Sequence, residues 1–305
     1  VPLIPELGSH LIAAGGKRMR PLLTLAGARV AGATADSAGE AAAIKLATAV
    51  EFIHSATLLH DDVIDESDLR RGRDTANALW GNEASVLVGD FLFARSFELM
   101  VEAGNLDVLG RLSAAAARIT EGEIKQMAIT GAPDTPIEDY LEVITGKTAI
   151  LFAAAAAAGA EIAGGTPADV SAMHDYGLKL GLAFQIMDDA LDYAADAADM
   201  GKNTGDDFVD QKITMPTILA WQKADDTERA FWQRTLGAAQ FADGDLEIAQ
   251  GLLEKHGAIA ASLTAAREYA ASASATIVVH CGTGPAASIG SALADAAAFA
   301  AARTS

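Results

Sequence analysis

Apolar residues recur at spacings of three and four along most of this chain, which is the periodicity of helices that bury one face. Alanine, the strongest helix former, is abundant. Thr135 and Thr166, each followed by proline and by an acidic residue at the third helical position, are predicted N-caps. Strand-like alternation is missing before residue 275, and only residues 276–285 look like a strand. The chain is therefore predicted to be all-α, with one large helical domain over residues 1–305.

Two local features of the predicted helices affect packing. The helix over residues 105–127 is expected to be interrupted or kinked near Gly122. The run of small residues over 151–164, LFAAAAAAGAEIAG, fits either the wall of an apolar tunnel or close packing between helices. The sequence leaves both interpretations of this run open.

Charge and cysteine usage limit the partners and the compartment. The net charge is −19, from 41 acidic and 22 basic residues, which argues against nucleic-acid binding. The single cysteine, Cys281, allows no internal disulfide and fits a reducing, cytoplasmic location. We find no signal peptide, and we expect no transmembrane segment because no strongly apolar run is long enough. The chain starts at Val1 without methionine, so the native N-terminus is expected to be incomplete.

Two copies of the pattern Asp-Asp-x-x-Asp each end an apolar helical segment. The first cluster contains Asp61, Asp62 and Asp65, and the second contains Asp188, Asp189 and Asp192. Residues four apart lie on one helix face, so each copy presents several carboxylates to one point. Mg²⁺ prefers oxygen ligands and completes its coordination shell with water and substrate phosphate oxygens. The clusters therefore predict Mg²⁺ sites on opposing walls of one cavity.

Basic residues near the aspartates indicate an anionic substrate. Lys17, Arg18 and Arg20 follow two glycines, and three arginines, Arg70, Arg71 and Arg73, follow the first cluster. Lys147, Lys202 and Lys212 stand in or after glycine-containing motifs. A nucleotide-binding P-loop is excluded for Lys147, because the glycine required six residues earlier is Leu141. Carboxylates together with cationic side chains fit a diphosphate bridged to the protein by a metal ion.

Five motifs together resemble the trans-polyprenyl diphosphate synthase family. They are GGKRMRP, HDDVIDESDLRRG, GKT, FQIMDDALD and GKNTGDD, in the family's order between about residue 12 and about residue 220. The resemblance implies an all-α isoprenoid synthase fold with a deep central cavity, and a homodimer. It implies a Mg²⁺-dependent enzyme that joins an allylic diphosphate to isopentenyl diphosphate and releases pyrophosphate. Beyond residue 270 no family signature is visible.

The resemblance also implies roles for individual residues. The implied metal ligands are Asp61, Asp65, Asp188, Asp189 and Asp192, and Asp62 is a further candidate. Isopentenyl diphosphate binding falls to Lys17, Arg20, His54 and Arg71. The allylic diphosphate is expected to face Arg70, Lys147, Gln185, Lys202 and Lys212, with Thr148 beside it. The catalytic residues are expected to be Asp61, Asp65, Arg70, Lys147, Asp188 and Lys202.

Product length in this family depends on side chains just before the first cluster. The positions five and four residues upstream of Asp61 are Ala56 and Thr57, both small. An open apolar tunnel favours continued growth, so we expect a long-chain product of roughly C40–C50, a precursor of quinone side chains. Octaprenyl, nonaprenyl and decaprenyl products remain open. Ile124, Met127 and Phe152 are expected at the cavity floor.

Four other functions share some of these features. A medium-chain geranylgeranyl diphosphate synthase would need a bulky floor deeper in the cavity. A class I terpene cyclase would carry a different second motif from DDALD. The pair His60–Asp61 suggests a metal-dependent phosphohydrolase, but the other histidines do not supply a matching ligand set. A non-catalytic helical subunit would be expected to lose the aspartates, and both clusters are intact.

Overall fold

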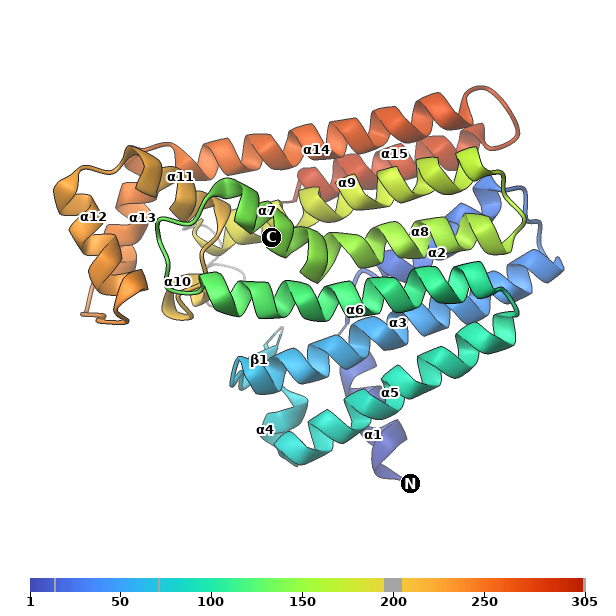
Figure 1. Ribbon diagram of the computed structural model, residues 1–305, viewed down its shortest axis with the longest axis horizontal. Coiled ribbons are helices and arrows are strands. Elements are labelled where there is room, and N and C mark those ends of the chain that lie inside the picture. The colour runs from blue at the N-terminus through green and yellow to red at the C-terminus, as the bar shows by residue number, and fades with distance from the viewer. Residues whose placement is uncertain (14, 71, 195–204, 304–305) are drawn as a thin grey trace. The chain divides into compact units, whose positions relative to one another are not determined.

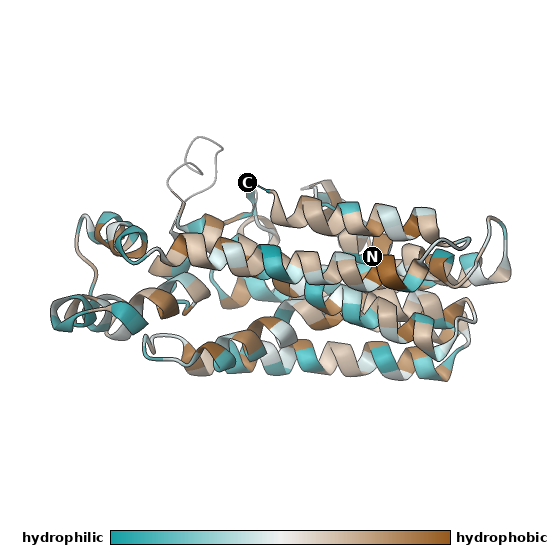
Figure 2. Ribbon diagram, turned by 90° about the horizontal axis from the view of Figure 1, so that it is seen from above, coloured by the Kyte–Doolittle hydropathy of each residue, from teal (hydrophilic) through white to brown (hydrophobic). Residues whose placement is uncertain are grey.

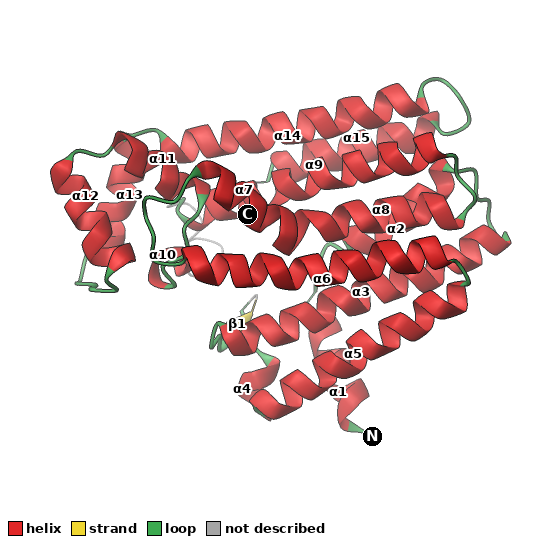
Figure 3. Ribbon diagram, viewed as in Figure 1, coloured by secondary structure: helices red, strands yellow, loops and turns green. Residues whose placement is uncertain are grey.

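The computed structural model describes residues 1–13, 15–70, 72–194 and 205–303. Nearly all regular structure in this part of the chain is helical, with one pair of two-residue strands (Figure 3). Hydrophobic and hydrophilic residues alternate along the helices in short blocks (Figure 2), as helices with one buried face require. The predicted all-α fold class is confirmed.

The described residues group into two compact units. The first comprises Val1–Ala116, Ala154–His174 and Cys281–Ile289, and the second Ala117–Ala153, Asp175–His280 and Gly290–Ser305. Elements of the first unit are α1 (Leu3–Ala13), α2 (Met19–Val30), α3 (Ala38–Ile64), β1 (Leu69–Arg70), β2 (Arg73–Asp74), α4 (Ala76–Trp80) and α5 (Asn82–Ala103). The single domain over residues 1–305 stays a prediction.

The second unit holds most of the shorter helices. They are α7 (Ile137–Ile144), the π-helical turn η1 (Thr145–Ala149), α10 (Asp206–Val209), α11 (Met215–Lys223), α12 (Asp226–Trp232), the π-helical turn η3 (Gln233–Gly237) and α13 (Asp245–Lys255). Five long helices contribute residues to both units: α6 (Leu106–Ile129), α8 (Ile150–Ile162), α9 (Pro167–Asp192), α14 (Ala258–Cys281) and α15 (Ala287–Ala301). Figure 1 labels the α-helices among these elements.

The first unit is built on α3, the helix that leads to the first aspartate cluster. It begins after Ser37, whose hydroxyl accepts a 3.1 Å hydrogen bond from the Glu40 amide. Its buried face carries Ala56 and Leu59, which cluster with Leu7 of α1 and with residues of α4 and α5. Burial of this face is what fixes the direction in which α3 ends.

Close packing of α2 against the alanine-rich helix α8 explains the run of small residues. A Cβ on Gly27 would lie 2.2 Å from the carbonyl oxygen of Ala156, and a Cβ on Gly159 would lie 1.8 Å from that of Thr24. Only glycine allows the backbones to approach this closely. The structure therefore gives direct support to the packing interpretation of LFAAAAAAGAEIAG.

The second unit has a core of large side chains. Tyr140, Ile186, Phe208 and Trp232 are each at most 2% exposed and belong to one hydrophobic cluster. The same cluster includes residues from α13 and α14. The core of this unit therefore supports α7, which carries Tyr140, and α9, which carries the second aspartate cluster.

Of the two predicted N-caps, one is confirmed and one is wrong. Before α9, the Thr166 hydroxyl accepts from the Asp169 amide, and the Asp169 carboxylate accepts from the Thr166 amide, as in a capping box. Before α7, the Thr135 hydroxyl instead donates a 2.6 Å hydrogen bond to the Ala132 carbonyl oxygen. Pro136 is the N-cap and α7 begins at Ile137, because the threonine side chain is already bonded to the preceding turn.

The prediction of an interruption near Gly122 is also wrong. Helix α6 runs without interruption from Leu106 to Ile129. A Cβ on Gly122 would lie 2.5 Å from the Lys147 backbone nitrogen, so the absence of a side chain allows α6 to approach η1.

The strand-like segment 276–285 is not a strand. Its first part is the end of helix α14, which runs to Cys281, and the rest forms the turn before α15. The buried positions Ala266, Ala270, Ala273 and Ile277 follow the spacing of a helix. Tertiary packing on this period therefore overrides the local β propensity of the Thr-Ile-Val-Val run.

Two helical stretches are long and apolar enough, by length and composition alone, to cross a membrane. They are Ala38–Ile64 and Ile137–Ile162, with 50% and 83% of the most apolar window buried inside the fold. Buried core helices of water-soluble proteins satisfy the same test. The expectation that the chain has no transmembrane segment stays a prediction.

Candidate metal and diphosphate site

The first aspartate cluster lies at the C-terminal end of α3. The Asp65 amide donates a 2.8 Å hydrogen bond to the Asp61 carbonyl oxygen, so these residues are one helical turn apart, as predicted. Asp65 itself is the C-cap of the helix. The side chains of Asp61 and Asp65 are therefore attached to the same face of the helix.

Asp62 lies in a different environment from its neighbours in the cluster. Its side chain is 2% exposed, and its Oδ1 accepts from Arg70 Nε at 2.8 Å and from Arg70 Nη2 at 2.7 Å. The structure thus places two predicted site residues against each other, with Arg70 neutralising Asp62. This pair ties the β1–β2 hairpin to the end of α3.

Two residues assigned to isopentenyl diphosphate meet in the first unit. Arg20, near the start of α2, has its Nη1 3.1 Å from His54 Nε2 on α3. Lys17 is exposed in the segment before α2. Arg71, the fourth member of the predicted set, lies outside the described residues.

The second cluster ends α9 in the other unit, and a chain of hydrogen bonds holds it. Asp189 is 6% exposed; its Oδ2 accepts from the Tyr140 hydroxyl at 2.6 Å and its Oδ1 from Gln185 Nε2 at 2.7 Å. The Gln185 amide oxygen in turn accepts from the Thr148 hydroxyl at 2.8 Å. The GKT turn is therefore bonded to the aspartate cluster through one glutamine.

The remaining aspartates of this cluster also have protein partners. Asp192 Oδ2 accepts a 3.1 Å hydrogen bond from the Asp207 amide. Asp188 Oδ1 accepts a 2.7 Å hydrogen bond from Arg303. Burial raises the pKa of Asp189 and the pKa of Asp192 to about 6, against the opposing effect of their hydrogen bonds. A bound cation would favour the charged forms of both carboxyls.

The GKT motif forms the π-helical turn η1, a geometry that is frequent at functional sites. Lys147 on this turn donates a 2.9 Å hydrogen bond to Glu123 Oε2 of α6. Lys212 donates a 2.8 Å hydrogen bond to Asp210. Lys202 lies outside the described residues.

The donor set fits a divalent metal shared with a diphosphate. In the described part of the chain, no three His, Cys, Asp or Glu side chains are arranged to hold a metal alone. Mg²⁺ is usually held by one or two carboxylates together with substrate phosphate oxygens. The pairs Asp61–Asp65 and Asp188–Asp192 supply carboxylates in that number.

The positions assigned to product length lie just before the first cluster. Ala56 is 1% exposed in the core of the first unit, and the Thr57 hydroxyl donates to the His54 carbonyl oxygen at 2.8 Å. Ile124 and Met127 are 62% and 66% exposed, so they do not form a buried floor as expected. Phe152, at 1% exposed, is buried.

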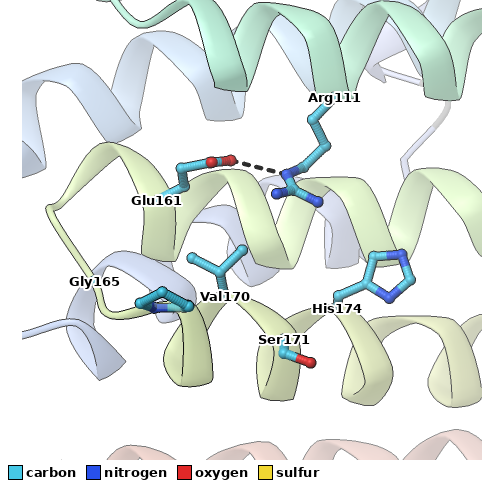
Figure 4. Close-up of a pocket in the computed structure, with 7 residues that line it drawn as sticks. Arg111, Glu161, Gly165, Val170, Ser171 and His174 are labelled. Carbon is cyan, nitrogen blue, oxygen red and sulfur yellow. Dashed lines mark hydrogen bonds and ion pairs between the residues drawn. The ribbon is translucent and has the colours of Figure 1, made fainter.

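A groove of about 550 Å³ in the first unit is separate from these residues. Arg111 from α6, Glu161 from α8 and His174 from α9 line it (Figure 4). Arg111 Nε lies 2.9 Å from Glu161 Oε2, so the groove's arginine is neutralised by its own wall. None of the aspartates of the two clusters lines this groove.

Three residues at the site were missed by the sequence reasoning. Tyr140 precedes Lys147 by seven positions, two helical turns, and this spacing is a signal that could have been used. Glu123, the partner of Lys147, carries no comparable signal. Arg303 lies 115 positions after Asp188, and no local pattern connects such distant residues.

The chain matches a family model described as polyprenyl synthetase over residues 1–252. The chain belongs to this family. Family membership confirms the recognition from the five motifs and the class of enzyme, a trans-prenyltransferase.

Relatives of this polyprenyl synthetase include long-chain enzymes. Octaprenyl diphosphate synthase from Escherichia coli (strain K12) is 48% identical over 220 residues, which cover 72% of this chain and 67% of that protein. The crystal structure of a decaprenyl diphosphate synthase from Rhodobacter capsulatus has a TM-score of 0.92 at 49% identity, covering 99% of this chain and 90% of the other. A polyprenyl synthase from Caulobacter crescentus CB15, crystallised with calcium and isoprenyl diphosphate, has a TM-score of 0.91 at 48% identity, covering 99% and 89%. These likenesses confirm the isoprenoid synthase fold.

Proposed function

We propose that this polyprenyl synthetase extends an allylic diphosphate with successive isopentenyl diphosphates to an all-trans product of roughly C40–C50, for quinone side chains. The main support for the proposal is the geometry of the second aspartate cluster. Asp188 and Asp192 lie one turn apart, and the GKT turn is bonded to Asp189 through Gln185. Such an arrangement can hold a metal and a diphosphate side by side.

The proposed outer metal ligands are Asp61 and Asp65 in the first cluster and Asp188 and Asp192 in the second, and each cluster takes Mg²⁺. When bound, Mg²⁺ would supply charge stabilisation to the pyrophosphate leaving group. Asp189 adds charge to the site while Tyr140 and Gln185 hold both of its oxygens. Asp62 acts through Arg70, whose guanidinium it holds in place.

The basic residues orient the two diphosphates in this proposal. Arg20, Lys17, His54 and Arg71 take isopentenyl diphosphate, and the Arg20–His54 contact supports a shared role for these two. Lys147 and Thr148, which lie on η1, bind the allylic diphosphate. The further residues that bind this diphosphate are Arg70, Gln185, Lys202 and Lys212. Positive side chains stabilise the charge that develops on the leaving group. Water has to be kept away from the allylic cation, which a deep apolar cavity would do.

Two further properties belong to the same proposal. The chain forms a homodimer, supported by exposed apolar side chains one turn apart on α5, Leu87 at 66% and Phe91 at 43%. The location is cytoplasmic, supported by the single cysteine. Sedimentation or light scattering of the purified chain tests the dimer, and Leu87→Glu is expected to weaken it.

Product length tests the function. Purified protein is incubated with Mg²⁺, farnesyl diphosphate and labelled isopentenyl diphosphate, and the dephosphorylated products are separated by thin-layer chromatography. We expect product of roughly C40–C50. Product that stops at geranylgeranyl length would favour the medium-chain alternative, and phosphate release without isopentenyl diphosphate would favour the phosphohydrolase.

A further inference from the structure

The C-terminal segment lies outside the residues that match the family model, yet it reaches the second aspartate cluster. The match ends at residue 252, and α14 and α15 follow. Helix α15 lies along α9 (Figure 1), where the Tyr176 hydroxyl donates a 2.6 Å hydrogen bond to the Leu293 carbonyl oxygen. Two residues after α15 ends, Arg303 contacts the last turns of α9.

Arg303 is held by several groups at once. Its Nη2 donates to Asp188 Oδ1 at 2.7 Å and to the Phe184 carbonyl oxygen at 3.3 Å, and its Nε donates to the Ala300 carbonyl oxygen at 3.2 Å. The guanidinium carbon lies 4.1 Å from the centre of the Phe184 ring. The Arg303 side chain is 5% exposed, whereas that of Asp188 is 35% exposed.

This burial requires a counter-ion. Removing a guanidinium from water costs free energy unless an anion compensates its charge, and Asp188 is the carboxylate that does so. A carboxylate paired with a guanidinium is a weaker ligand for a second cation, because the two positive charges repel each other at short range. Arg303 and a divalent metal would therefore compete for the Asp188 carboxylate.

We propose that Arg303 is an internal counter-cation that competes with the divalent metal for Asp188. Its positive charge keeps metal binding at the second cluster weak until a diphosphate brings additional negative charge. This inference rests on the proposed function, in which Asp188 is a metal ligand. It gives the C-terminal segment a role in the order in which the second cluster binds diphosphate and metal.

The alternative is that Arg303 only fastens α15 to α9. Charge and packing can be separated by two substitutions. Arg303→Gln removes the positive charge, whereas Arg303→Lys keeps it and loses the planar group that stacks on Phe184. A matched control is Arg234→Gln, because Arg234 makes a comparable pair with Asp245, at 2.7 and 2.8 Å. Neither of these residues belongs to an aspartate cluster.

The experiment measures Ca²⁺ binding by titration calorimetry in the absence of diphosphate. We expect Arg303→Gln to bind Ca²⁺ at least about threefold more tightly than wild type, because a repelling charge is gone. Arg303→Lys and Arg234→Gln should stay within about twofold of wild type. With inorganic pyrophosphate present, the gain for Arg303→Gln should shrink. Unchanged or weaker Ca²⁺ binding by Arg303→Gln overturns the proposal.

Asp188→Asn separates this inference from the proposed function. Weaker Ca²⁺ binding by Asp188→Asn, together with no change in Arg303→Gln, would overturn the role of Arg303 alone. Unchanged binding by Asp188→Asn would overturn both. If Arg303→Gln does not fold, amide hydrogen exchange of the wild-type chain, measured with and without Ca²⁺, replaces the calorimetry of this variant. Ca²⁺ should then speed amide exchange at the end of α15, and unchanged exchange overturns the proposal.

Discussion

The Tyr140 hydroxyl donates a 2.6 Å hydrogen bond to Asp189 Oδ2, and both side chains are buried. Tyr140 is on α7 and Asp189 is on α9, 49 positions later. The bond fixes one oxygen of a carboxylate whose other oxygen is fixed by Gln185. It therefore sets the orientation of the central aspartate of the cluster, between the two proposed metal ligands Asp188 and Asp192.

Tyr140→Phe is expected to raise the Mg²⁺ concentration needed for half-maximal turnover. The substitution leaves Asp189 Oδ2 buried without its donor, so the carboxylate can turn. Tyr176→Phe is the matched control, because it also removes a buried tyrosine hydroxyl with a 2.6 Å hydrogen bond. Both variants should lose about 1 kcal/mol of stability. Equal effects of the two variants on the Mg²⁺ requirement would contradict the orienting role of Tyr140.

Gly122→Ala is expected to lower turnover strongly. Its Cβ would lie 2.5 Å from the Lys147 backbone nitrogen, so η1 has to move and Lys147 with it. Gly110→Ala on the same helix is the control, since its Cβ would meet nothing within 4 Å. The control should be neutral or more stable by up to about 1 kcal/mol. Turnover at saturating substrate is the measurement, and normal turnover of Gly122→Ala would refute the need for close approach at η1.

Ala56→Phe is expected to shorten the product, because it adds bulk five residues before Asp61, where the proposed function places an apolar tunnel. Ala56 is buried, so the variant should also lose about 1–3 kcal/mol of stability through overpacking. Ala49→Phe, at another fully buried alanine of α3, controls for that loss. Chromatography of the products decides: a length distribution unchanged from wild type, or shortened equally by both variants, counts against the tunnel.

Acid stability should depend on Glu228. Hydrogen bonds from Lys255 and then from His256 lower the pKa of Glu228 to about 2. Because this folded-state pKa lies below the unfolded value of about 4.3, the stabilisation is present above pH 4.3 and is lost as the pH falls towards 2. The Tm difference between wild type and Glu228→Gln should therefore be largest near pH 6 and shrink on acidification. A difference that stays constant down to pH 2.5 would show that Glu228 is not responsible.

The sequence predicted the all-helical class and the location of each aspartate cluster at a helix end, because helical periodicity and motif spacing are local properties. It did not predict the partners of the clusters. Arg70 on Asp62 and Arg303 on Asp188 depend on how distant segments pack. The role of Gly122 also depends on a distant neighbour, because the backbone that it approaches includes Gly146, 24 positions away. The stretch 276–285 has local β propensity, but burial on a helical period makes its first part the end of α14.

The central claim is that both aspartate clusters hold metal and diphosphate for one reaction. Incorporation of labelled isopentenyl diphosphate into farnesyl diphosphate, measured for Asp61→Ala and for Asp188→Ala with the exposed Asp243→Ala as control, tests it most directly. We predict that each of the first two variants loses turnover while the control keeps it. Elongation close to the wild-type rate in either Asp61→Ala or Asp188→Ala would contradict the claim.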